Sequence, residues 1–289
     1  MKHLNTYITE YIIKKKLDKP IDSEDHYKYF PKTKEELISN IKELFDKGET
    51  NLNIIDTSKI TDMSHLFGAF NNIEKINFDV SRWDVSKVEN MYSIFFNCKK
   101  FDCDLSKWDV SNVKKTSYMF YDCESFEGKG LENWDVSNVE NTKYMFNGCK
   151  KLNCDLSSWN VSNVEDITGM FINCVNLNSD FSNWNMHNVT NMKYMFYGCK
   201  KFEGKGLENW DVSNVENMSC MFQNCENFEG KGLENWDVSN VKYMDKMFSY
   251  CVNFTGKGLE NWNIRNVTRM NDIFEKCTSL KNKPSWYKE

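Results

Sequence analysis

The sequence predicts an α/β solenoid of about nine turns of 25–26 residues, each with one short strand and one short helix, behind an N-terminal helical cap. Valine follows each repeat tryptophan after five residues, phenylalanine after twelve and cysteine after fifteen. Self-similarity at such a period is typical of stacked repeats, here called coils, that pack only on their neighbours. The eight tryptophans that set the 25- or 26-residue period are Trp83, Trp108, Trp134, Trp159, Trp184, Trp210, Trp236 and Trp262.

The chain of 289 residues divides into a helical cap, residues 1–50, and a repeat solenoid, residues 51–289. Apolar residues at helical spacing predict a first helix over 5–16. A second helix is expected after Thr33, because Thr33 and Glu36 have the spacing in which side chains satisfy free backbone amides, and Gly48 marks its end. This second helix should cover the open end of the first coil, since an uncapped solenoid exposes its core.

Each coil has a strand signal followed by a helix signal. Trp134 and Val136 alternate with Asp135, as in a short strand with one buried face. Ser137 and Glu140 then have the spacing of a helix N-terminus. Methionine, phenylalanine and cysteine lie three, seven and ten residues after the valine, which places them on one face of a helix.

The spacing of these elements predicts a curved stack of short parallel strands. Paired strands lie about 4.8 Å apart, whereas packed helices need about 8–10 Å. The coils should therefore fan out on the helix side, with the strands on the concave side.

Composition and charge exclude several classes of function. Apolar residues make up 40% of the chain and aromatic residues 15%, enough for a core. A net charge of −5 is not the basic balance of a nucleic-acid-binding protein. No apolar run approaches the roughly 18 residues that span a bilayer.

The absence of an export or lipid signal and the odd number of eleven cysteines predict reduced thiols in the cytoplasm. A virion or the cell surface is the alternative location.

The repeat resembles a known family. The sequence Asn-Trp-Asp-Val-Ser-Asn-Val-Glu-Asn-Met, followed by Met-Phe and Cys within 209–225, is similar to the BspA-like leucine-rich repeats, in particular the Trp-Asp-Val-Ser-Asn-Val type of mycoplasma-type surface lipoproteins. The resemblance covers about residues 55–286. It implies a curved leucine-rich-repeat-like solenoid used in adhesion or protein recognition, with no catalytic residues.

Cysteine, glycine and histidine do not predict a chemical site. The cysteine column should consist of buried thiols, because coils 8–10 Å apart on the helix side exceed the roughly 7 Å Cα separation that a disulfide spans. The Gly128-Lys129-Gly130 connector and its copies lack a P-loop spacing, and positive φ angles explain their glycines. None of the four histidines lies in a catalytic or metal motif. We expect no enzyme activity, no cofactor and no metal.

Acidic residues around each tryptophan form the candidate site for a partner. The position after Trp is Asp in five repeats and Asn in the other three. This restriction is explained either by an acidic surface that binds a basic protein or by side chains that stabilise a turn. The sequence therefore predicts a monomeric protein-interaction module, with a structural or adhesive component of a virion or cell surface as the alternative. The candidate residues are Asp84, Asp109, Asp135, Asp211, Asp237, Glu132, Glu208, Glu234 and Glu260.

Overall fold

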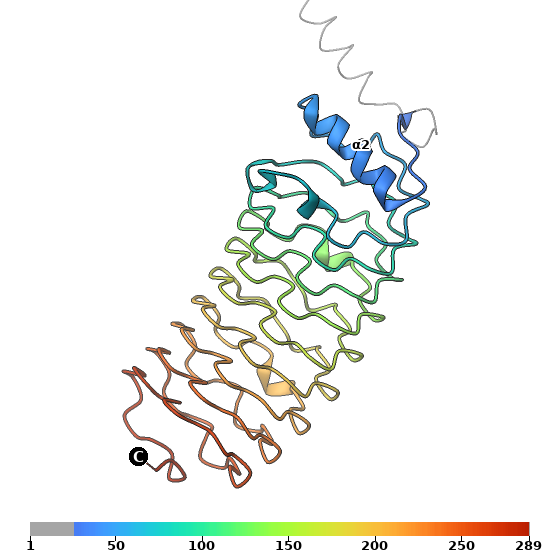
Figure 1. The fold of residues 1–289 in the computed structure, drawn as a ribbon. Helices are drawn as coiled ribbons and strands as arrows, with labels where there is room; N and C mark the ends of the chain where they lie inside the picture. The colour runs from blue at the N-terminus through green and yellow to red at the C-terminus, as the bar shows by residue number, and fades with distance from the viewer. Residues whose placement is uncertain (1–25, 289) are drawn as a thin grey trace, which may run out of the picture.

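The computed structural model describes residues 26–288, so the helix predicted over 5–16 lies outside the described residues. One α-helix, α2 (Lys34–Asp46), precedes the stacked coils (Figure 1). The other regular elements are short 3-10 helices: η2 (Phe67–Ala69), η3 (Ile73–Lys75), η4 (Leu131–Asn133) and η5 (Leu207–Asn209).

The coils stack in parallel along one axis. Single β-bridges, all parallel, join each coil to the next through the residue seven positions after Trp. This arrangement confirms a repeat solenoid, and Figure 1 shows α2 at its N-terminal end. Nine residues form this continuous row: Asp62, Asn90, Lys115, Asn141, Asp166, Asn191, Asn217, Tyr243 and Arg269.

The short helix predicted in each coil is wrong, because the described repeats contain no α-helix. The N–H groups of Met91, Ser93 and Phe95 donate to carbonyls of the next coil at 2.9, 3.0 and 2.9 Å. Ile94 and Cys98 instead donate to carbonyls three residues back in their own coil, at 3.2 and 3.0 Å. This segment, seven to fifteen residues after each Trp, is therefore a run of β-turns paired with its neighbours; we call it the paired face.

Left-handed residues make these β-turns possible. Ser93 and Asn97, ten and fourteen positions after Trp83, have φ angles of 56° and 61°. A positive φ at the third residue of a four-residue turn is the pattern of a type II turn and ends any α-helix. The same two positions are left-handed in every later coil. The predicted Ser-x-x-Glu helix starts are therefore wrong as well.

The strand prediction is correct only for the direction of the side chains. Trp134 and Val136 are buried and Asp135 is exposed, as expected. Trp134 is extended, with φ −77° and ψ 130°, but the parallel bridge of its coil forms seven residues later, at Asn141. The curvature was predicted from a mismatch between strand and α-helix spacing, and this reason fails because the described coils contain no α-helix.

Side-chain ladders hold successive coils together through the core. Each indole Nε1 after the first coil donates to a backbone carbonyl of the preceding coil, as Trp159 does to Leu131 at 2.8 Å. The cysteine column does the same: Cys174 Sγ donates to the Phe146 carbonyl at 3.0 Å. Tryptophan rings stack 6.2–6.4 Å apart in two runs, from Trp108 to Trp184 and from Trp210 to Trp286. Phenylalanine rings lie 5.3–6.0 Å apart along the described stack. Each coil is thus bonded to the one before it by its own core residues.

All eleven cysteines are free, and all except the half-buried Cys154 are buried, which confirms the predicted structural thiols. Burial raises the pKa of Cys103 and of Cys154 to about 12. The predicted reason was wrong, however, because no α-helices separate the described coils. From Cys123 to Cys277 the thiols of the repeat column bond to a carbonyl of the preceding coil, whereas Cys98 bonds within its own coil.

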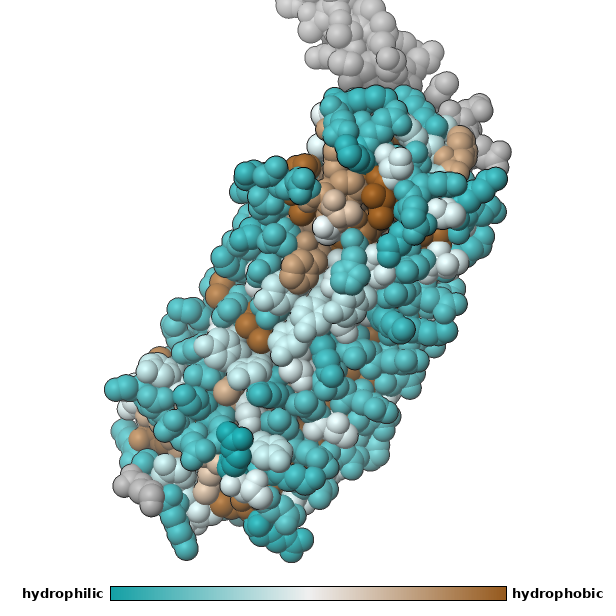
Figure 2. Space-filling model, in the orientation of Figure 1, coloured by the Kyte–Doolittle hydropathy of each residue, from teal (hydrophilic) through white to brown (hydrophobic). Residues whose placement is uncertain are grey.

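The predicted second helix of the cap is confirmed as α2. Thr33 Oγ1 accepts a hydrogen bond from the Glu36 N–H at 3.2 Å, and Leu37, Ile41 and Leu44 bury their side chains against the repeat core. Figure 2 shows hydrophobic side chains gathered beside this helix on a largely hydrophilic face.

The domain boundary at residue 50 stays a prediction. Within residues 26–288, no helix combines the length and apolar content that crossing a membrane requires.

Candidate functional site

The acidic strip consists of the nine predicted carboxylates, Asp84, Asp109, Asp135, Asp211, Asp237, Glu132, Glu208, Glu234 and Glu260. All nine residues are exposed. The aspartates directly follow a buried tryptophan, and the glutamates precede one by two residues. The rigid Trp ladder therefore fixes the backbone from which both kinds of side chain project.

A turn explains why this column holds only Asp or Asn. Oδ1 of Asp135 accepts a hydrogen bond from the Ser137 N–H at 3.0 Å, and Oδ1 of Asn160 accepts one from the Ser162 N–H at 3.1 Å. The same bond, from the N–H two residues on, forms in all eight repeats. Such a turn needs the side-chain oxygen and not the charge, so Asp and Asn serve equally well. The turn uses only one carboxylate oxygen of each aspartate.

Hydrogen bonds lower the pKa of three strip aspartates, Asp135, Asp211 and Asp237. Hydrogen bonds from Ser213 and then from His187 lower the pKa of Asp211 to about 2. His187 belongs to the preceding repeat, and its Nδ1 lies 2.8 Å from Asp211 Oδ2. Hydrogen bonds from Ser239 lower the pKa of Asp237, while the negative charge of Asp211 acts in the opposite direction. Neighbouring aspartates in the column are therefore close enough to repel one another.

The acidic strip lacks the ion pairs that neutralise other carboxylates. Elsewhere, lysines bridge neighbouring coils, as Lys114 does to Glu89 at 3.0 Å and Lys242 to Glu216 at 2.8 Å. Among residues 26–288, none of the ion pairs between lysine or arginine and a carboxylate involves the nine strip residues. Apart from the contact of His187 with Asp211, the strip is therefore a row of exposed carboxylates that form no ion pair with a described lysine or arginine.

The glutamates of the strip come from the glycine connectors. Glu132 Oε2 accepts a hydrogen bond from the Gly130 N–H at 3.0 Å, and Glu260 does the same with Gly258. Gly130 has a φ of 95°, and a Cβ there would lie 2.1 Å from the backbone nitrogen of Ser106. Only glycine allows the connector to pass so close to the preceding coil, which in turn positions Glu132.

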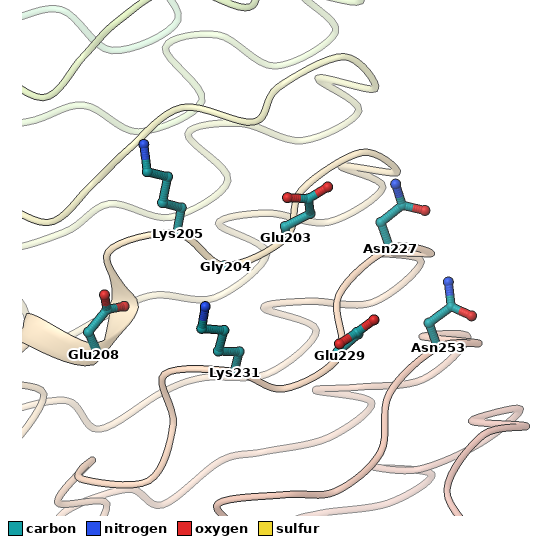
Figure 3. A pocket seen from close by; sticks show the side chains of 8 residues that line it. All are labelled: Glu203, Gly204, Lys205, Glu208, Asn227, Glu229, Lys231 and Asn253. Carbon is teal, nitrogen blue, oxygen red and sulfur yellow. The ribbon is translucent and has the colours of Figure 1, made fainter.

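Two connectors enclose an open depression of about 600 Å³ (Figure 3). Glu208 of the acidic strip lies in it near Lys205 and Lys231, with Glu203 and Glu229 farther along. The sequence did not predict this depression, because it forms only when connectors of successive coils stack. Within the described residues, no group of three or more His, Cys, Asp or Glu side chains is arranged to hold a metal ion.

Comparisons with known proteins place the chain in a family. No curated protein matches it. Among solved structures, one match is the crystal structure of a TLR13–ssRNA13 complex, with 11% identity and a TM-score of 0.27, covering 86% of this chain and 48% of that one. The chain thus spans about half the length of that protein, and the likeness is too low to support further comparison. The family model described as "Mycoplasma protein of unknown function, DUF285" matches residues 38–130, 127–206 and 199–288. The chain therefore belongs to this mycoplasma repeat family, DUF285.

Proposed function

We propose that this protein is a non-enzymatic protein-binding module that recognises a basic partner through the acidic strip. The observation that carries the proposal is the row of exposed carboxylates without lysine or arginine partners in the described residues, on a surface where other carboxylates are paired. A negative potential of this kind attracts a basic protein and accelerates its association. The resemblance to BspA-like repeats, which implies protein recognition or adhesion, agrees with this proposal.

The ladder structure supports rigid recognition. Stacked tryptophans and inter-coil hydrogen bonds fix the spacing of successive aspartates, so the strip loses little freedom when a partner binds. That the protein is monomeric, has no enzyme activity and needs no cofactor stays a prediction from the sequence, as does its location in the cytoplasm.

The proposal is tested by replacing Asp211 and Asp237 together with asparagine. Asparagine keeps the turn, as it does naturally at position 160, but removes both charges. The probe is a labelled lysine-rich peptide, with a glutamate-rich peptide as its control. At low salt we expect the double variant to bind roughly tenfold more weakly, which corresponds to about 1.4 kcal/mol for two exposed charges. Physiological salt should reduce the difference.

The matched control is Glu216→Gln, which removes one negative charge that is already paired with Lys242. This variant should bind the lysine-rich peptide nearly as well as the wild type. Equal binding by the wild type and the double aspartate variant at low salt would exclude the acidic strip as the binding site.

A further inference from the structure

A second surface feature lies on the paired face, away from the acidic strip in each repeat. We call it the aromatic ladder; it comprises His65, Tyr92, Phe96, Tyr118, Tyr121 and Tyr144. In four successive coils the rings of His65, Tyr92, Tyr118 and Tyr144 follow one another at centroid separations of 4.9, 5.6 and 5.0 Å. Tyr121 widens this row, since its ring lies 5.8 Å from that of Tyr118.

The rings of the aromatic ladder are accessible. His65 and Phe96 are exposed, and the four tyrosines are half-buried. The stacked core is complete without them, because the buried phenylalanine and tryptophan columns fill it. Aromatic residues, tyrosine among them, are enriched at protein interfaces, where their apolar rings carry a polar end.

Two ladder residues adopt a backbone conformation that is unfavourable for their size. Tyr118 and Tyr144 have φ angles of 58° and 55°, a conformation that is unfavourable for a bulky residue. At the same position of the next coil, Gly169 adopts a φ of 62° without such a cost.

The other left-handed column provides the contrast. Fourteen residues after Trp, this column holds asparagine, aspartate or glycine in six of its eight copies. These are the residues that tolerate a positive φ most easily. Ten residues after Trp, by contrast, the column holds Ser93, three tyrosines, Gly169, Cys220, Lys246 and Asp272, so the residue type there is not restricted to those that favour the turn. The six copies are Asn97, Asp122, Gly148, Asn173, Gly198 and Asn224.

The ladder offers hydrogen-bond donors in its tyrosine hydroxyls. Two lysines of the same coils are paired, Lys143 with Asp166 at 3.0 Å and Lys150 with Glu124 at 2.7 Å. Among the described residues, no hydrogen bond satisfies the hydroxyl groups of Tyr118 or Tyr144. A ligand for this surface should therefore be apolar in part and rich in hydrogen-bond acceptors.

We propose that the aromatic ladder binds a proline-rich segment of a partner protein in the polyproline II conformation. Such a segment has apolar rings and carbonyl groups without internal hydrogen bonds, which tyrosine hydroxyls can satisfy. Its three-residue turn rises about 9 Å. The steps from the Tyr92 ring to the Tyr118 ring and on to the Tyr144 ring are 5.6 and 5.0 Å. Successive turns of the segment can thus meet rings two coils apart.

The proposal goes beyond the acidic strip and does not depend on it. The probe is a labelled, uncharged peptide of about twelve residues, mostly proline, with a Gly/Ser peptide of equal length as its control. The test variant is Tyr118→Asn with Tyr144→Asn, since asparagine tolerates the left-handed backbone. We expect fluorescence anisotropy to show binding of the proline-rich peptide by the wild type, and at least tenfold weaker binding by the variant.

Tyr250→Asn is the matched control. Tyr250 is also a left-handed, exposed tyrosine, with φ 61° and 41% exposure, but it lies outside the ladder and has no ring contact among the described residues. This variant should bind the peptide like the wild type. Unchanged melting temperatures of all variants would show that the fold is intact.

Several results would overturn the assignment. One is equal affinity of the wild type for the proline-rich and Gly/Ser peptides. Another is undiminished binding by the double tyrosine variant, and a third is the absence of peptide binding at millimolar concentration. Binding of neutral oligosaccharides in place of the peptide would also contradict it. The Asp211 and Asp237 variants should leave binding of the uncharged peptide unchanged, so this proposal and the acidic strip can fail separately.

Discussion

Replacing Trp159 by alanine should destabilise the stack far more than the same replacement of Trp286. Trp159 is 2% exposed and stacks between Trp134 and Trp184, each 6.3 Å away. Trp286 is only half-buried and stacks on Trp262 alone, at 6.4 Å. Both indoles donate to a carbonyl of the preceding repeat, at 2.8 and 2.7 Å. The comparison therefore isolates burial and the number of stacked neighbours.

The magnitude follows from burial. Truncating a fully buried tryptophan to alanine costs about 3–5 kcal/mol, including the cavity that it leaves. The lost indole hydrogen bond contributes about 1 kcal/mol of this total. The Leu131 carbonyl does not become unsatisfied, because it also accepts the Trp134 N–H at 3.2 Å. With one stacking face and partial exposure, Trp286 should cost roughly 1–2 kcal/mol.

Urea unfolding monitored by tryptophan fluorescence measures the difference, since eight of the nine tryptophans remain in each variant. Trp159→Phe is the intermediate control, because it keeps an aromatic ring but loses the indole hydrogen bond; it should cost about 1–2 kcal/mol. Similar midpoints for Trp159→Ala and Trp286→Ala would refute the view that each coil is stabilised by the neighbours on both of its sides.

Three further outcomes are expected. Asp135→Ala should lower stability by about 1 kcal/mol in thermal melts because the Ser137 N–H loses its partner, whereas Asp135→Asn should change little. The Cys174 thiol, whose pKa is raised by complete burial, should react with iodoacetamide only after unfolding; mass spectrometry of the native protein would contradict this if it found rapid labelling. The hydrogen bond from Lys129 lowers the pKa of Asp104 to about 2. Since the unfolded value is about 3.9, its contribution to stability is present above about pH 4 and is lost as pH falls towards 2; Asp104→Asn should therefore flatten the acid limb of a stability curve.

The sequence was sufficient to predict the stacking of repeats, their length and the buried columns. Trp, Val, Phe and Cys recur at fixed intervals, and all four columns are buried in the inner coils. The error arose in the segment after the valine. A run of four-residue β-turns buries the first and fourth residues of each turn, as Met91, Ile94, Phe95 and Cys98 show. An α-helix buries the same spacing, so apolar periodicity does not separate the two structures.

One clue in the sequence does separate them. The residue before each repeat cysteine is often Asn, Asp or Gly, as Asn97 and Gly148 are, and these residues favour the left-handed conformation that a helix interior excludes. For the candidate site, the sequence left two explanations open for the column that contains Asp135 and Asn160: a side chain that stabilises a turn, or a negative charge that binds a partner. The structure shows that the turn forms. Whether a strip carboxylate has a lysine partner depends on which side chains of neighbouring coils come into contact, and this cannot be read from a single repeat.

The direction of the inter-coil hydrogen bonds gives the molecule distinctive mechanical properties. These bonds join one coil to the next, as those of Met91 and Trp159 do, so pulling the two ends of the stack apart loads the coil interfaces in series. A coil that detaches converts a layer about 5 Å thick into roughly 85 Å of extended chain. Under tension the stack would therefore lengthen in discrete steps, one repeat at a time, and act as an extensible tether whose weakest interface yields first.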